Sequence, residues 1–276
     1  MSPEVAATIE RGPPLQAWRR FGVARLGGLL AVPTMRRLER FVAAAYDAVA
    51  REIDRASPTD PELRDSFIKW RGIPVNTLPR FLRRYEAELA GELRDLAQEV
   101  DAAVGSALGI RGWPRWRPLP AASYLRRHVD ASAYVPWHID ADAAGTALVS
   151  AACFNVWVPL EAVGNGSPSL QLIPGSHRQM RDMPLLRDTA WPYRSDDWVG
   201  QNIAGEPWTP TLAPGDALLF DQYVLHRTQS DGLSRTGRTS CEFRFVNMPH
   251  SLPAIVRSTL KRRVSRAATA LASRLR

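Results

Sequence analysis

The chain has 276 residues, of which 45% are hydrophobic and 23% are charged. This composition is typical of a globular protein with a buried core and argues against a disordered chain. The length suits one domain with elaborations, so we expect a single domain over 1–276. The longest apolar stretch, 22–33, is interrupted by Arg25 and is too short to span a membrane.

The net charge of +8 is concentrated at the end of the chain. Seven of the 36 basic residues lie in 257–276, which holds no acidic residue, so the rest carries 29 basic residues against 28 acidic ones. A basic tail of this kind is usually a solvated helix face. Binding to nucleic acid or to an anionic membrane is the alternative, but a nucleic-acid partner is not the expectation.

The two cysteines, Cys153 and Cys241, lie in apolar stretches and are expected to pack as small apolar side chains. Two cysteines make no disulfide framework, and the N-terminus has no charged-then-apolar signal pattern. We therefore expect a cytoplasmic protein. The sequence gives no indication of its oligomeric state.

The first 115 residues are predicted to be mainly helical. Two apolar stripes recur at helical spacing: Leu38, Phe41, Val42, Ala45 and Val49, and then Leu82, Tyr85, Leu89, Leu93, Leu96, Val100 and Val104. Thr77 and Pro79 are suitable for the start of the second helix. Before these helices, Phe21–Leu30 is predicted to form a short strand and a turn.

Residues 116–250 contain short apolar runs separated by turn residues, a pattern typical of a β-sandwich or barrel such as a jelly roll. The expected strands are Ala122–Arg126, Tyr134–Ile139, Ala151–Leu160, Ser169–Ile173, Trp208–Leu212, Ala217–Phe220 and Thr239–Asn247. Arg178–Pro207 is predicted to be a long loop that serves as a lid or binding loop. Residues 251–276 are predicted to form a basic amphipathic helix.

Two His-x-Asp pairs stand out among the five histidines: His128-Val-Asp130 and His138-Ile-Asp140. On a strand, the two side chains of such a pair point to the same face, because the side-chain period is two. With a second, distant histidine they form the 2-His-1-carboxylate set that suits Fe(II). A His-x-Asp pair alone is weak evidence, because it also arises by chance.

Further features follow His138-Ile-Asp140 in a fixed order. They are the strand Asn155-Val-Trp157-Val-Pro159-Leu160, the turn Pro174-Gly175-Ser176-His177, the turn and strand Pro214–Phe220, His226, and Arg238 at the start of the last strand. His226 lies 86 residues after Asp140, and Arg238 lies 12 residues after His226.

With these features, the chain resembles the phytanoyl-CoA dioxygenase-like family of Fe(II)/2-oxoglutarate-dependent oxygenases over roughly Tyr124–Asn247. The resemblance implies a double-stranded β-helix core with the N-terminal helices packed on it. It also implies oxidation of a small organic substrate by O₂ and 2-oxoglutarate, with release of succinate and CO₂. The residues implied to hold iron are His138, Asp140 and His226. Those implied to surround 2-oxoglutarate are Arg238, Thr228, Trp157 and Asn155.

The chain departs from the family pattern at one point. The family's arginine more often lies 11 residues after the second histidine, a position that Gly237 occupies here. Arg238 is preferred to Arg235 because it directly precedes a strand, and Arg244, in the middle of that strand, is a weaker candidate. Asp140 argues against the related halogenases, which have a small residue at that position.

The remaining candidates have ordinary structural interpretations. His177 is predicted to be a turn or surface residue and His250 a structural residue. Arg126 and Arg127 are predicted to be surface charges, with contact to an acidic substrate as the alternative. His128 and Asp130 are expected in a loop near the mouth of the site. Trp191, Trp198 and Trp208 are predicted either to line a substrate pocket or to anchor the loop.

Three other functions stay open. One is a cupin-type metal enzyme without 2-oxoglutarate, which would have no use for Arg238. The others are a binding protein with the same core and a nucleic-acid binder that acts through its tail. The sequence does not identify the substrate, nor does it choose among hydroxylation, desaturation and ring formation.

Overall fold

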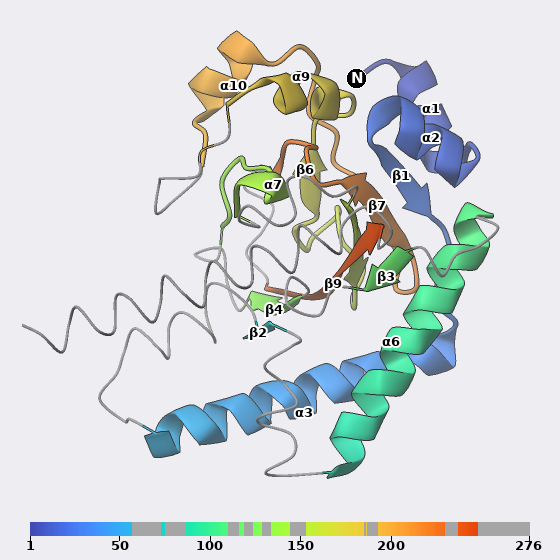
Figure 1. The fold of residues 1–276 in the computed structure, drawn as a ribbon, viewed down its shortest axis with the longest axis vertical. Helices are drawn as coiled ribbons and strands as arrows, with labels where there is room; N and C mark the ends of the chain where they lie inside the picture. The colour runs from blue at the N-terminus through green and yellow to red at the C-terminus, as the bar shows by residue number, and fades with distance from the viewer. Residues whose placement is uncertain are drawn as a thin grey trace, which may run out of the picture.

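The centre of the protein is a seven-stranded antiparallel sheet with the strand order β1-β7-β5-β9-β4-β2, in which β3 also pairs with β9 (Figure 1). The structure is a computed structural model, and it describes residues 1–56, 73–74, 87–109, 116–118, 124–128, 134–143, 153–184, 186, 193–229 and 237–247. The strands of this sheet are β1 (Val23–Leu26), β2 (Ile73–Pro74), β3 (Trp116–Pro118), β4 (Tyr124–His128), β5 (Cys153–Pro159), β7 (Ala217–Asp221) and β9 (Arg238–Asn247).

A smaller sheet faces the first. It pairs β6 (Leu170–Leu172) with β8 (His226–Thr228), and isolated bridges extend it at His138↔His226, Trp137↔Arg194 and Leu172↔Trp208. Two facing antiparallel sheets of this kind form a jelly roll. The expected double-stranded β-helix core is therefore confirmed.

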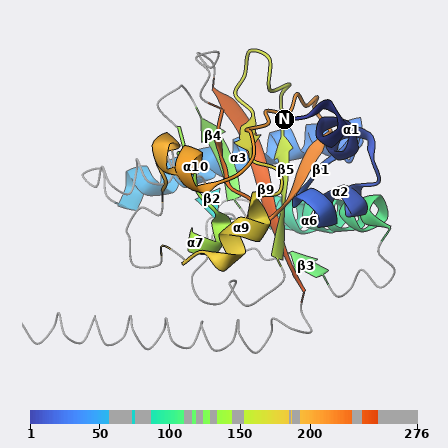
Figure 2. The same ribbon diagram turned by 90° about the horizontal axis from the view of Figure 1, so that it is seen from above.

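Helices cover the two sides of the large sheet differently (Figures 1 and 2). The long helices α3 (Val32–Ala56) and α6 (Ala87–Leu108) pack on each other and on one face of the sheet. The short helices α7 (Asp140–Ala143), α9 (Ser176–Asp182) and α10 (Asp196–Asn202) lie on the opposite side, beside the small sheet. Near the N-terminus, α1 (Pro3–Arg11) and α2 (Pro14–Phe21) contact β1.

Strand alternation separates the core from the polar interior. Along β9, Cys241, Phe243 and Phe245 belong to the cluster that packs under α3 and α6. The residues between them, Glu242 and Arg244, are also buried, but they point into the space between the two sheets. On the neighbouring strand β5, Phe154, Val156 and Val158 face the helices, whereas Asn155 and Trp157 face that space. One face of the sheet thus forms the core, and the other carries polar groups.

The predicted elements agree with the structure in part. The first apolar stripe lies within α3, the second overlaps α6, and β1 lies within the predicted strand at Phe21–Leu30. The strand predicted at Tyr134–Ile139 is wrong, because only isolated bridges form at Trp137 and His138 and a helix begins at Asp140. The strand predicted at Trp208–Leu212 is likewise reduced to single bridges at its two ends. The segment Arg178–Pro207, predicted as a loop, contains most of α9 and all of α10.

Several predictions lie outside the described residues. They include the C-terminal helix at 251–276 and the helix start at Thr77 and Pro79. Within the part of the chain that the structure describes, none of the helices combines the length and apolar character that a membrane crossing requires.

Gly22 joins α2 to β1 and fixes how closely α9 approaches them. Its φ of 72° is left-handed, and its N–H closes α2 by donating to the Trp18 carbonyl. A Cβ at this position would lie 2.5 Å from His177 Nδ1 and 2.7 Å from Val224 Cγ2. Glycine is therefore required both by the backbone conformation and by the neighbouring side chains.

We expect Gly22→Ala to lower the free energy of unfolding by about 2–4 kcal/mol, because left-handed backbone strain adds to overpacking against His177. Denaturant unfolding would measure this loss. Gly200→Ala in α10 is the matched control, since its Cβ would meet nothing within 4 Å. A helical Gly→Ala change should be neutral or stabilise by about 0.5–1 kcal/mol. Equal effects of the two substitutions would contradict the assigned role of Gly22.

Candidate metal centre and cosubstrate pocket

Three side chains that were predicted as metal ligands meet at one point between the sheets. His138, Asp140 and His226 each offer a ligand atom, and these atoms all lie within 4.8 Å of one another. Asp140 and His226 are buried, and His138 is partly buried. Two imidazoles and one carboxylate with access from one side are a donor set that suits Fe(II).

The backbone holds the two histidines face to face. His138 N–H donates to the His226 carbonyl at 2.9 Å, and His226 N–H donates to the His138 carbonyl at 3.0 Å. The ring centroids are consequently only 4.2 Å apart. This two-way bridge brings together residues 88 positions apart without any contribution from their side chains.

Each histidine ring is oriented by a carbonyl close to it in the chain. Nδ1 of His138 lies 2.8 Å from the Pro136 oxygen, and Nδ1 of His226 lies 2.9 Å from the Val224 oxygen. Because a carbonyl only accepts, both Nδ1 atoms must donate, which leaves both Nε2 lone pairs for a metal. Burial and the nearby His226 lower the pKa of His138 to about 3, so its imidazole is neutral near pH 7, as a ligand must be.

Asp140 is the first residue of α7, where the Ala141 N–H donates to the Gln222 carbonyl. Burial by itself would raise the pKa of Asp140, but Arg244 and His226 together keep that pKa below its usual value. Arg244 Nη2 donates to Asp140 Oδ1, and Asn155 Nδ2 donates to Asp140 Oδ2. The carboxylate is therefore ionised and held in place on both oxygens.

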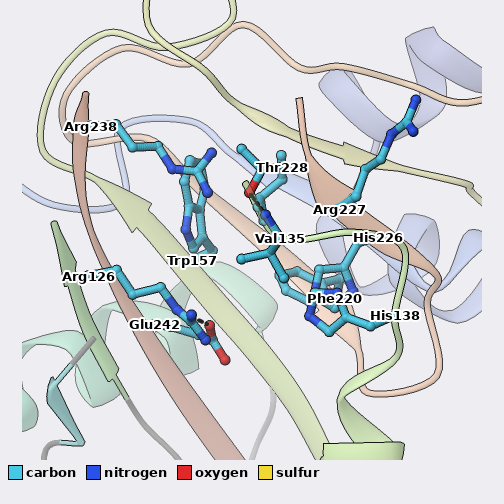
Figure 3. Close-up of a pocket in the computed structure, with 11 residues that line it drawn as sticks. Arg126, Val135, His138, Trp157, Phe220, His226, Arg227, Thr228, Arg238 and Glu242 are labelled. Carbon is cyan, nitrogen blue, oxygen red and sulfur yellow. Dashed lines mark hydrogen bonds and ion pairs between the residues drawn. The ribbon is translucent and has the colours of Figure 1, made fainter. Parts of the chain in front are cut away.

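A narrow pocket extends from the histidines between the sheets. Its lining consists of Arg126, Val135, His138, Trp157, Leu170, Phe220, His226, Arg227, Thr228, Arg238 and Glu242. Figure 3 shows the two histidines with Phe220 at one end and the Arg238 guanidinium beside Trp157 at the other. The pocket thus joins a candidate metal centre to a buried cation.

Arg238 is well placed to receive an anion. It is 3% exposed, and its Cζ lies 5.0 Å from the centre of the Trp157 ring. Nη1 donates to the carbonyls of Pro168 and Ser169, while the buried Nε has no hydrogen-bond partner among the described residues. Burial and the neighbouring Arg126 lower the pKa of Arg238 to about 9. A carboxylate in the pocket would supply the charge and the acceptors that this guanidinium lacks.

Thr228 and Asn155, both predicted beside the cosubstrate, occupy different places. Thr228 lines the pocket, and its backbone and hydroxyl are fixed by hydrogen bonds with Val135. Asn155 does not line the pocket, because its amide reaches the Asp140 carboxylate instead. Strand alternation nevertheless puts Asn155 on the same face of β5 as Trp157.

Other predicted residues differ from expectation. His177 is not on the surface: it is 7% exposed, because the absence of a side chain at Gly22 leaves room for its ring. Trp208 is buried in an apolar cluster, and Trp198 packs beside the Arg194 guanidinium, so neither lines the pocket. The Trp191 position and the side chains of His128 and His250 lie outside what the structure describes.

Sequence reasoning missed three charged residues of the site. Arg126 was predicted as surface charge, yet it lines the pocket with its Nε 3.6 Å from Glu242 Oε2. Glu242 and Arg227 were not singled out. Glu242 lies four residues after Arg238 and therefore on the same face of the last strand, and this spacing could have identified it.

Residues at the start of α10 and just before it bind the segment that carries His138 and Asp140. Arg194 Nη1 pairs with Asp142 Oδ2 at 2.7 Å, and both side chains are almost fully buried. The Arg194 N–H donates to the Trp137 carbonyl, and the indole N–H of Trp137 donates to Asp196. These bonds fix the chain on both sides of His138.

A sequence model of the phytanoyl-CoA dioxygenase family matches residues 18–236, which is most of the chain. The chain belongs to this family. The family comprises non-haem iron oxygenases, so the expected enzyme class, a 2-oxoglutarate-dependent dioxygenase with iron(II), is confirmed. The comparison with curated protein sequences finds no significant match.

Solved structures share the fold at low sequence identity. AviO1 from Streptomyces viridochromogenes Tue57 is 22% identical, with a TM-score of 0.52, over 87% of this chain and 96% of its own. EvdMO1 is 22% identical with a TM-score of 0.54, over 86% of this chain and 49% of its own. EvdO2 from Micromonospora carbonacea var. aurantiaca, solved in complex with 2-oxoglutarate, is 19% identical with a TM-score of 0.50, over 85% and 89%.

We expect Arg194→Met to lower the free energy of unfolding by about 3–5 kcal/mol, because it leaves the buried Asp142 carboxylate unpaired. Thermal or denaturant unfolding would measure the change. Arg37→Met is the control: Arg37 is also paired with glutamates, but all of these side chains are partly exposed. Its loss should cost much less, because ion pairs that water can reach contribute little to stability. A small effect of Arg194→Met would mean that the pair does not fix this segment.

Proposed function

We propose that this enzyme hydroxylates a small organic substrate, consuming O₂ and 2-oxoglutarate and releasing succinate and CO₂. The observation that carries the proposal is the arrangement of one pocket. His138 and His226, which cluster with the Asp140 carboxylate, line one end of it, and a buried arginine lines the other. A dicarboxylic 2-oxo acid matches this arrangement, because one end can chelate a metal while the other pairs with a cation.

In this proposal His138, Asp140 and His226 hold Fe(II). Arg238 and the Thr228 hydroxyl bind the far carboxylate of 2-oxoglutarate, with the Trp157 ring as a wall of the pocket. Arginine suits this role because its planar fork donates two charge-assisted hydrogen bonds to a carboxylate. When bound, the metal would activate O₂, which is the oxidant, and 2-oxoglutarate would supply two of the electrons that its reduction requires.

The remaining residues of the pocket orient the bound groups and shield them from water. Leu170, Phe220 and Val135 provide apolar wall, which limits the access of water to the pocket. The Phe220 ring lies 4.9 Å from the His226 ring and restricts its motion. Orientation and exclusion of water are thus the contributions of this chain.

EvdO2, which shares the fold, was solved with 2-oxoglutarate, and this supports the cosubstrate assignment. SnoK, described as a non-haem α-ketoglutarate-dependent carbocyclase, is 14% identical with a TM-score of 0.51 over 90% of this chain and 84% of its own. Ring formation therefore stays open beside hydroxylation. We propose the cytoplasm as the compartment, where the buried, free thiols of Cys153 and Cys241 remain reduced.

Anaerobic titration with Fe(II) and 2-oxoglutarate tests the centre directly. We expect a weak visible charge-transfer band that requires both additions and is absent in Asp140→Ala, because the chelate needs an anchored metal. His128→Ala is the control and should retain the band. A folded, iron-loaded protein without a band would favour a cupin-type enzyme that does not use 2-oxoglutarate.

Arg238→Gln tests the cosubstrate anchor. Loss of charged hydrogen bonds costs about 1.5–3 kcal/mol, so the KM for 2-oxoglutarate should rise about 10- to 100-fold. Succinate release at varied 2-oxoglutarate would measure it, and the KM for the substrate should change far less. Arg181→Gln, at an exposed arginine of α9, is the control. Equal rises in both KM values would point to another anchor.

A further inference from the structure

Arg244 is a buried cation that the proposed roles leave unexplained. It is 3% exposed and lies six residues after Arg238 on the same face of β9. It does not line the pocket, so it is not positioned to bind 2-oxoglutarate. Instead, Nη2 donates to Asp140 Oδ1, and Nε and Nη2 lie 2.9 and 2.8 Å from Glu242 Oε1.

Asn155 completes the arrangement from the neighbouring strand. It is the direct cross-strand partner of Arg244 and is fully buried. Its amide donates to Asp140 Oδ2, while Arg244 donates to Asp140 Oδ1. Two adjacent strands therefore fix the plane of one carboxylate, with a different donor on each oxygen.

The two oxygens are not equivalent toward the metal position. Oδ2 lies 3.8 Å from His226 Nε2 and is one edge of the ligand cluster. A carboxylate oxygen has about two lone-pair sites, so Oδ2 can accept from Asn155 and still bind a metal. Oδ1 is engaged by a guanidinium, and that cation would have to be displaced before Oδ1 could bind a metal.

We propose that Arg244 is a positioning residue that keeps Asp140 bound to the metal through one oxygen only. This inference rests on the proposed function. It matters for the reaction because an octahedral metal has six positions. Two imidazoles and one carboxylate oxygen leave three positions, enough for a chelating 2-oxo acid and for O₂. A carboxylate bound through both oxygens would occupy one of those three.

Glu242 offsets the positive charge of Arg244, which would otherwise be unfavourable so close to a metal ion. Its Oε1 accepts from Arg244, and its Oε2 lies 3.6 Å from Arg126 Nε. Charges of opposite sign thus alternate from Asp140 through Arg244 and Glu242 to Arg126, which lines the pocket. Glu242 offsets the charge of Arg244 and also holds its guanidinium, so Glu242 acts on the metal ligand through Arg244.

The test is Co(II) binding to the full chain, measured by titration and by the visible ligand-field spectrum of the bound ion. For Arg244→Gln we expect about 10- to 100-fold weaker binding, the usual effect of removing a partner of a metal ligand. We also expect an altered spectrum, because Oδ1 becomes free to coordinate. Arg244→Lys keeps the positive charge but loses the planar fork, and should lie between Arg244→Gln and wild type.

A double-variant cycle separates positioning from simple loss of structure. Glu242→Gln should weaken Co(II) binding in the same direction but less. Arg244→Gln combined with Glu242→Gln should bind no more weakly than Arg244→Gln alone, because Glu242 acts through Arg244. The double variant removes both buried charges and therefore protects the fold if the single variant is unstable. Arg181→Gln changes an exposed arginine that does not line the pocket, and it should match wild type in affinity and spectrum.

The outcomes are distinct. Weaker binding with an altered spectrum in Arg244→Gln, partly restored in Arg244→Lys, supports the inference. Unchanged or tighter binding in Arg244→Gln or in the double variant overturns it, because the cation would then be neutral toward the metal or compete with it. A wild-type protein that binds no Co(II) would contradict the proposed metal centre itself, and the role of Arg244 would fall with it.

Discussion

Two backbone hydrogen bonds between His138 and His226 are the constraint on which the rest of the site depends. They join the segment before α7 to β8, and they set the ring separation before any metal is considered. Because these bonds belong to the backbone, they put no demand on the side chains, whose Nδ1 atoms bind nearby carbonyls. The Nε2 atoms consequently converge on a position prepared by the fold. Preorganisation of this kind spares a metal the cost of ordering its ligands.

Burying so many charges is tolerable only because nearly all of them face a partner. Asp140 is flanked by Arg244, and Asp142 is paired with Arg194. Arg238 differs, since the groups that it meets are carbonyls and an aromatic ring. A cation satisfied by neutral acceptors retains a preference for an anion, whereas a cation already paired with a carboxylate does not. This contrast distinguishes a binding arginine from a structural one inside a single site.

Much of this arrangement could be predicted from the sequence, because it depends on the periodicity of apolar side chains and on the order of motifs along the chain. The strand predicted at Ala151–Leu160 contains β5, and the apolar stripe around Leu38 correctly indicated a helix. The predictions that were wrong concerned features that depend on tertiary contacts. The segment with His138 and Asp140 has strand-like composition but pairs only at single bridges, since α7 begins at the aspartate. The burial of His177 depends on Gly22, 155 positions away, and no local pattern could show it.

The polar face of β9 carries Arg238 at its first residue, then Glu242 and Arg244, while Cys241, Phe243 and Phe245 pack under the long helices. A shift of the strand by one residue against β5 would exchange the two faces. Arg238 and Arg244 would then enter the apolar core, and Phe243 and Phe245 would enter the pocket. A misregistered chain would therefore be inactive and also poorly folded, and so exposed to proteolysis. Correct folding and catalysis therefore require the same register of β9. Insertions or deletions within this strand would disturb both.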